Sequence, residues 1–110
     1  MRDEARKWAD GVIEIDRYET VLEEAQRLTH GDRPADYGHP LDDFSCTAQL
    51  WSALLGIPVT AEQVGLCMIA VKLSRESRKA KRDNRTDIAG YAEALERLHV
   101  ERARRAANEP

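Results

Sequence analysis

The sequence predicts an all-α fold, a bundle of four to five helices. Apolar residues recur at three- and four-residue steps in successive segments from Thr20 onward, which is the spacing of one buried helix face. Clusters of glycine and proline at 31–40 and 56–58 separate these segments. The alternation of apolar and polar residues at 12–16 is too short to predict a strand.

The composition indicates one small domain. A chain of 110 residues supports a single core, and 42% hydrophobic with 34% charged residues is typical of a soluble helical protein. The net charge of −3 argues against a dedicated DNA-binding domain. The chain starts without an apolar signal segment, and no apolar run approaches the ~20 residues that span a bilayer. We therefore expect a cytoplasmic protein without membrane contact.

The two cysteines suggest neither zinc nor an obligatory disulfide. Cys46 and Cys67 lie in different helical segments, and neither has a Cys or His nearby at ligand spacing. We predict two buried, reduced thiols, with a disulfide between them as the alternative.

Start and stop signals place the helices. Gly31 favours a left-handed end to the first helix, and Pro40 suits the first position of the second. The residues at 56–58, Gly-Ile-Pro, end the second helix. Thr60 and Gln63 form a capping box that starts the third.

The loop 31–40, GDRPADYGHP, is crowded with side chains that can recognise a ligand. In one interpretation Tyr37 covers the edge of the core, while the loop aspartates make local turn hydrogen bonds. In the other, Arg33 binds an anion, and Tyr37 or His39 stacks on a flat ring. The residues alone leave both interpretations open.

The third helix is predicted to be the central one. Its segment 64–73 is apolar almost all round, as in a helix surrounded by other helices. Lys72 and Arg75 continue one face of this segment as a cationic stripe. The fourth helix is predicted to start near Asp83, with Asp83 or Asn84 as its N-cap.

Cations at the end of the third helix are expected to meet carboxylates at the start of the fourth. Asp87 and Tyr91 lie one turn apart on the fourth helix. The group is either a structural ion-pair network or a site for a phosphorylated ligand. In the second case Lys72 and Arg75 face phosphates, Tyr91 stacks on a base, and Asp83 with Asp87 holds Mg²⁺ or a ribose.

The fourth helix closes the core. Its predicted buried stripe comprises Ile88, Ala92, Leu95 and Leu98. Gly90 inside the helix indicates a close approach to another helix, since glycine costs up to ~1 kcal/mol there relative to alanine. The polar residues from Glu101 onward are expected to fray.

The chain is expected to divide into an N-terminal arm or short extra element at 1–18, one helical domain at 19–106 and a frayed tail at 107–110. Basic residues are concentrated between 75 and 85, without interleaved aromatic residues. Such a run is usually solvated, so nucleic-acid binding is the weakest hypothesis for this protein.

Three motifs resemble a family of small helical proteins encoded by tailed bacteriophages and prophages. They are GDRPADYGHP, LDDFSCTAQLW, and K-x-x-R followed by DNRTDIAGYA. Members share GDR-x-x-DYG-x-P, N/D-F-x-x-x-A-x-x-W and K-x-x-R with D-N/S-x-x-D-x-A-G-Y. The resemblance runs from about Thr20 to Leu95 in the same order. It implies a phage-related helical protein of unknown function.

The chain is more distantly similar to the nucleotide-modification-associated domain of phages and to the MazG-like and dimeric dUTPase group. Those all-α nucleoside triphosphate pyrophosphohydrolases hold Mg²⁺ with an E-x-x-E helix and an E-x-x-D helix. The resemblance implies that Asn84 and Asp87 occupy the second motif, and Asp42 or Asp43 with Cys46 the first. The metal and catalytic candidates that follow from it are Asp42, Asp43, Asp83 and Asp87.

Two functions stay open. The first is a nucleotide-directed protein with a MazG-like fold, which binds a nucleoside triphosphate or modified nucleotide, or hydrolyses it to the monophosphate and pyrophosphate. Its ligand-binding candidates are Arg33, Tyr37, His39, Lys72, Arg75, Asn84 and Tyr91. The second is a non-enzymatic module that binds a host or phage protein, with the charged cluster structural. The apolar third helix and the MazG-like resemblance imply a homo-oligomer, a dimer or tetramer.

Overall fold

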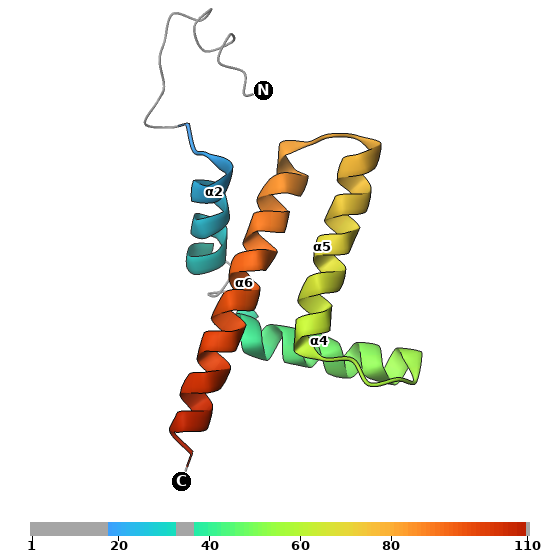
Figure 1. Ribbon diagram of the computed structural model, residues 1–110, viewed down its shortest axis with the longest axis vertical. Helices are drawn as coiled ribbons and strands as arrows, with labels where there is room; N and C mark the ends of the chain where they lie inside the picture. Colours follow the sequence, from blue (N-terminus) through green and yellow to red (C-terminus); the bar gives the residue numbers. More distant parts are fainter. Residues whose placement is uncertain (1–17, 33–36, 110) are drawn as a thin grey trace, which may run out of the picture.

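The computed structural model describes residues 18–32 and 37–109 (Figure 1). The elements are α2 (Val21–Arg27), a π-helical turn η2 (Leu28–Asp32), α4 (Pro40–Leu55), α5 (Ala61–Arg78) and α6 (Arg82–Ala107). These residues contain four α-helices and no strand, which confirms the all-α prediction. The predicted arm at 1–18 falls, except for Tyr18, outside the described residues.

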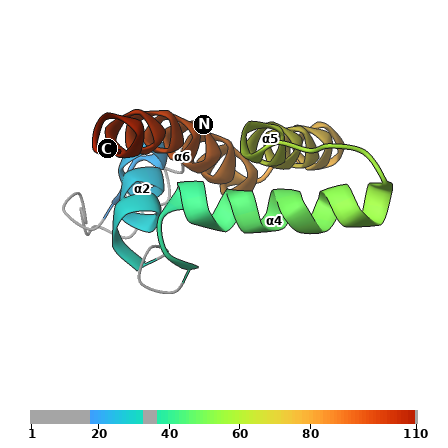
Figure 2. The ribbon, with the colours of Figure 1, turned by 90° about the horizontal axis from the view of Figure 1, so that it is seen from below.

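The central helix is α6, not α5. Within the described residues α6 contacts α2, α4 and α5, whereas α5 contacts only α4 and α6. Figure 1 shows α5 at one edge of the molecule and α2 on the other side of α6, and Figure 2 shows α4 crossing as a separate layer. The prediction that α5 is surrounded was wrong. Its outer side is uncovered, so Leu66 and Leu73 are exposed by 57% and 55%.

Both ends of α4 and the start of α5 follow the sequence signals. Thr60 Oγ1 accepts the Gln63 amide hydrogen at 3.1 Å, and the Gln63 side chain accepts the Thr60 amide hydrogen at 2.9 Å. Gly56 ends α4 with a φ of 72°, a left-handed conformation that glycine adopts without strain. Pro40 occupies the start of α4 as predicted.

The first helix ends differently from the prediction. Gly31 lies inside η2 and does not have a positive φ, so the predicted left-handed stop at Gly31 was wrong. The chain instead widens into a π-helical turn, and the buried Thr29 hydroxyl donates to the Ala25 carbonyl at 2.7 Å. At the other end of α2, Thr20 and Glu23 form a reciprocal capping box.

The start of α6 lies close to the predicted one, but its N-cap and its C-terminal end were predicted wrongly. The helix begins at Arg82 after Lys81, which makes no side-chain cap, so neither Asp83 nor Asn84 is the N-cap. Arg82 is held from α2, because its guanidinium donates to Glu24 at 3.1 Å and to the Glu19 carbonyl at 2.6 Å. The residues after Glu101 stay helical to Ala107 instead of fraying.

The core lies where α4, α5 and α6 cross. Its buried apolar residues are Leu41, Phe44, Ala48, Ala61, Val64, Ala94 and Leu98. Leu98 belongs to the predicted stripe of α6, but Ala92 is exposed and Ala94 is buried instead. The close helix approach lies at Gly65: a Cβ there would be 2.6 Å from Leu95 Cδ2, whereas one on Gly90 would have ordinary contacts.

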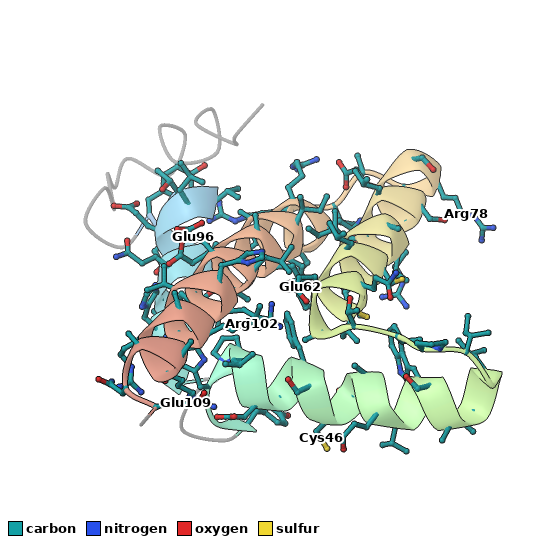
Figure 3. All side chains as sticks on the ribbon, turned by 60° about the horizontal axis from the view of Figure 1, so that its bottom comes forward. Cys46, Glu62, Arg78, Glu96, Arg102 and Glu109 are labelled. Atoms are coloured by element: carbon teal, nitrogen blue, oxygen red, sulfur yellow. The ribbon has the colours of Figure 1, made fainter. Side chains whose placement is uncertain are left out.

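Both cysteines are free and exposed. The predicted free thiols are therefore confirmed, while their predicted burial was wrong, because Cys46 on α4 and Cys67 on α5 are both exposed. Figure 3 shows Cys46 on the outward side of α4. None of the described helices is both long and apolar enough to cross a membrane.

Candidate functional site

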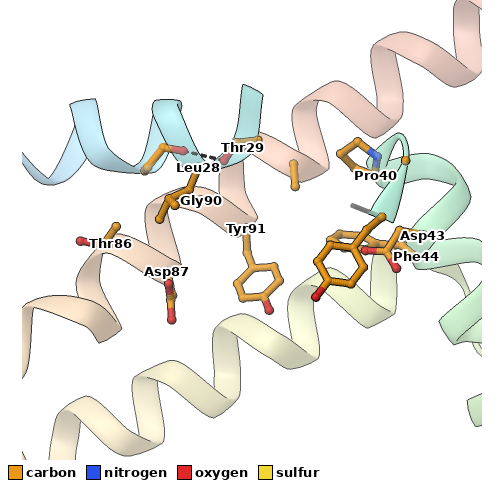
Figure 4. Close-up of a pocket in the computed structure, with 13 residues that line it drawn as sticks. Leu28, Thr29, Pro40, Asp43, Phe44, Thr86, Asp87, Gly90 and Tyr91 are labelled. Carbon is orange, nitrogen blue, oxygen red and sulfur yellow. Dashed lines mark hydrogen bonds between the residues drawn. The ribbon is translucent and has the colours of Figure 1, made fainter. Parts of the chain in front are cut away.

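A pocket of about 290 Å³ lies between α2 with η2, the start of α4 and the first half of α6 (Figure 4). Small residues leave this space open: Ala25, Thr29, Gly90 and Ala94. Larger side chains surround it: Tyr37, Asp43, Phe44, Asp87 and Tyr91. The site therefore combines three aromatic rings with two carboxylates.

α6 supplies the centre of the site. Asp87 and Tyr91 are four residues apart, so they project from the same face of the helix. Figure 4 shows Tyr91 between Asp87 of α6 and Asp43 of α4. The Tyr91 ring packs on Phe44 with 6.2 Å between centroids and 37° between planes. This contact fixes Tyr91 against the core while its phenol end reaches the pocket.

The predicted meeting of cations and carboxylates is confirmed for Lys72 and Asp87. Lys72 Nζ lies 2.9 Å from Asp87 Oδ2, and the two side chains are only 15% and 35% exposed. The pair joins α5 to the pocket wall on α6. Arg75 lies one turn beyond Lys72 and is exposed.

The loop candidates are only partly described. Tyr37 lines the pocket and is 59% exposed, so it forms the rim of the pocket rather than a plug in the core. His39 points elsewhere: its Nδ1 accepts the Leu41 amide hydrogen at 3.0 Å and thereby caps α4. Burial, followed by the charge of Arg97, lowers the pKa of His39. Arg33 lies outside the described residues.

Two candidates from the MazG-like comparison have structural partners instead. Buried Asn84 donates to Glu76 Oε1 at 3.1 Å. Asp42 forms a bidentate pair with Arg105 at 2.7 and 2.9 Å. The hydrogen bonds from Arg105 lower the pKa of Asp42, and they outweigh burial, which acts in the opposite direction. Asp83 is exposed in the first turn of α6 and does not line the pocket.

The donor set does not fit a metal centre made by the protein alone. Among the described residues, no three His, Cys, Asp or Glu side chains lie close enough together to hold a metal ion. Asp43 and Asp87 share the pocket, but Asp42 is turned to Arg105. The predicted three-carboxylate site at Asp42, Asp43 and Asp87 is therefore not formed here.

Sequence reasoning missed the polar network behind the pocket. Thr86 is buried, lines the pocket and donates to Glu24 Oε1 at 3.2 Å, the same oxygen that receives Arg82. It also missed that Gly90 and Ala94 make room for the pocket. Their spacing of four residues on one helix face is the signal that could have indicated this.

The family model called Domain of unknown function (DUF6378) matches residues 20–99. The chain belongs to this family. The matched segment includes α2, α4, α5 and every described residue of the pocket. The predicted resemblance to a domain of unknown function is thereby confirmed.

Two curated relatives come from mycobacteriophages. The Gene 55 protein of Mycobacterium phage D29 is 43% identical over 84 residues, which are 76% of this chain and 56% of that protein. The Gene 55 protein of Mycobacterium phage L5 is 34% identical over 83 residues, which are 74% of this chain and 53% of that protein. The chain thus spans little more than half the length of these relatives. No solved structure matches it.

Proposed function

We propose that this domain binds a nucleotide in the pocket between α2, α4 and α6, with the base against the tyrosines and the phosphates toward α5. The observation that carries the proposal is that one pocket is lined by Tyr37, Tyr91, Asp43 and Asp87, and that Asp87 is paired with Lys72 of α5. Aromatic rings offer stacking surfaces to any base. Carboxylates accept the amino and imino hydrogens of a base or the hydroxyls of a ribose.

The size of the pocket limits what it encloses. Ligand pockets typically measure about 300–1,000 Å³, and this one, at about 290 Å³, is at the lower end. It accommodates a base with part of its sugar, so the phosphates would lie outside it. Lys72 and the exposed Arg75 are the cations on that side.

Hydrolysis is the enzymatic form of the same proposal. The MazG-like resemblance suggests Mg²⁺-dependent cleavage of a nucleoside triphosphate to the monophosphate and pyrophosphate in the host cytoplasm. Because no three carboxylates gather in the described site, we derive no metal-dependent step. Mg²⁺ held by one carboxylate and the substrate phosphates is the arrangement left to test.

A thermal-shift panel of nucleoside mono-, di- and triphosphates, with and without Mg²⁺, tests the binding. A nucleotide at a hundred times its Kd should stabilise the fold by about 2.7 kcal/mol. Tyr37→Ala and Asp87→Asn should weaken the shift. Glu96→Gln, an exposed acid on the same helix outside the pocket, is the matched control. Pyrophosphate release is then measured for each nucleotide that binds, and the absence of any shift would overturn the proposal.

The second candidate is a non-enzymatic module that binds a host or phage protein. Lys72 and Asp87 satisfy each other without a ligand, which favours a purely structural role for the pair. In that case Asp87→Asn lowers the stability of the fold by about 1–2 kcal/mol, because it leaves the mostly buried ammonium of Lys72 without its counter-charge. On this hypothesis no nucleotide raises the melting temperature of the wild type or of Asp87→Asn.

A further inference from the structure

The outer side of α5 is a charge-free surface on a highly charged protein. Seven outward-facing residues are exposed, and none carries a charge: Gln63, Leu66, Cys67, Ala70, Leu73, Ser74 and Ser77. Charged residues make up 34% of the chain, so an uncharged exposed helix face is unexpected. Depletion of charge is what distinguishes the centre of protein interfaces from other surface. Figure 1 shows α5 on the side of α6 away from α2, with the last turns of α4 extending past its lower end.

The spacing of these residues is that of a helix-pairing seam. Gln63, Leu66, Ala70, Leu73 and Ser77 follow one another at steps of three, four, three and four residues. This 3.5-residue average keeps the side chains facing a partner helix along its whole length. We call these five residues the α5 seam.

The α5 seam also has the same chemistry in both directions. On either side of Ala70 comes a leucine and then a polar uncharged residue. An interface related by a two-fold axis needs a surface that is complementary to its own reverse. If two α5 helices pack antiparallel across an axis at Ala70, Leu66 of each copy meets Leu73 of the other. Ala70 is small enough to let the helices approach closely.

One copy alone leaves the fold open. Within the part of the chain that the structure describes, Leu98 is the one large side chain that is less than 2% exposed. A second copy on the α5 seam would cover two exposed leucines of each chain, while the pocket faces the interior between α2, α4 and α6.

We propose that a second copy of this chain packs on the α5 seam, forming a two-fold homodimer with antiparallel α5 helices. The two α5 helices and the two α6 helices behind them would then form one continuous helical layer. This inference gives the interface of the expected homo-oligomer, and it is independent of what the pocket binds.

Charge placed in the seam tests the proposal. The wild type should have twice the mass of one chain in light scattering across a dilution series. Leu66→Lys combined with Leu73→Lys should give the mass of one chain with an unchanged helical circular dichroism signal. Leu50→Lys combined with Leu54→Lys is the matched control, since these leucines are as exposed but lie on α4. A monomeric wild type, or a dimer that survives the α5 changes, would overturn the proposal.

Cross-linking tests the position of the axis without relying on a loss of association. With Cys46→Ser and Cys67→Ser in place, Ala70→Cys puts one thiol at the proposed axis, where mild oxidation should link two chains. Ala53→Cys in the same background is the control, because Ala53 is an exposed alanine on α4. A disulfide between two chains in Ala53→Cys but not in Ala70→Cys would place the contact between copies on α4 and contradict the α5 seam as the interface.

Discussion

The imidazole of His39 caps α4 only while its Nδ1 is unprotonated. That nitrogen accepts the Leu41 amide hydrogen at 3.0 Å, and a protonated ring has no acceptor to offer. Burial, followed by the charge of Arg97, lowers the pKa of His39 below its usual 6.5. Because the folded pKa is below the unfolded one, the stabilisation by His39 is fully present above about pH 6.5 and is lost as pH falls through the folded pKa.

We expect His39→Asn to remove this part of the acid sensitivity, because asparagine caps a helix without titrating. Urea unfolding at neutral pH and at about pH 5.5 should show a smaller loss of stability in the variant than in the wild type. His39→Ala should cost about 0.5–2 kcal/mol at neutral pH, the usual value of a lost N-cap. An identical pH dependence in wild type and His39→Asn would contradict the capping argument.

Gly65 and Gly90 show how the surroundings decide the value of a helix glycine. A Cβ on Gly65 would lie 2.6 Å from Leu95 Cδ2 and 3.2 Å from Phe44 Cε2. A Cβ on Gly90 would come no closer than 3.6 Å, to Thr29 Oγ1, and would extend into the pocket. The first position therefore needs glycine for packing, and the second needs it only to leave space.

Gly65→Ala is expected to destabilise the fold by about 1–3 kcal/mol through overpacking. Gly90→Ala should be neutral or stabilising by up to about 1 kcal/mol, because alanine favours a helix. Thermal unfolding of the two variants measures both effects. The same Gly90→Ala change should lower the affinity of any ligand that fills the pocket. A loss of stability in Gly90→Ala would contradict the open space around Gly90.

Helix ends were predictable where their signals are local. Thr60 with Gln63 and Gly56 lie within a few residues of the ends they define, and the structure confirms all three. The end of α6 was not predictable, because what holds it is distant in sequence. Arg105 pairs with Asp42, 63 residues earlier, and with Glu101 at 2.8 Å. No local pattern announces such a contact.

Arg105→Ala is therefore expected to make the residues after Glu101 fray. Hydrogen exchange of the α6 amides beyond that point should become several-fold faster. Arg104→Ala is the matched control, because Arg104 pairs with Glu101 but does not reach α4.

Hydrogen bonds from Arg104 and then Arg105 lower the pKa of Glu101 to about 2. The protection should thus be present above about pH 4.5 and be lost between there and about pH 2.

At the scale of the whole molecule, the sequence predicted the contact between Lys72 and Asp87 but not which helix is central. Lys72 and Asp87 form the expected ion pair, because they lie on α5 and α6, two helices joined by a short connection. The apolar character of α5 suggested a buried helix, yet part of that surface faces outward in one copy. A helix apolar all round is equally consistent with burial by a second chain, and periodicity does not distinguish the two.

The small core makes the stability of the molecule depend on few residues. Leu98 is fully buried where α4 and α6 meet, so Leu98→Ala should cost about 2–5 kcal/mol. That is a large part of the 5–15 kcal/mol typical of a domain, and urea unfolding should show it as a lower midpoint. Leu54→Ala removes the same atoms from a side chain that is 78% exposed and should change stability by less than about 0.5 kcal/mol. If Leu54→Ala were as costly as Leu98→Ala, the outer face of α4 would have to be buried against another copy, and the melting temperature of the wild type would then rise with protein concentration.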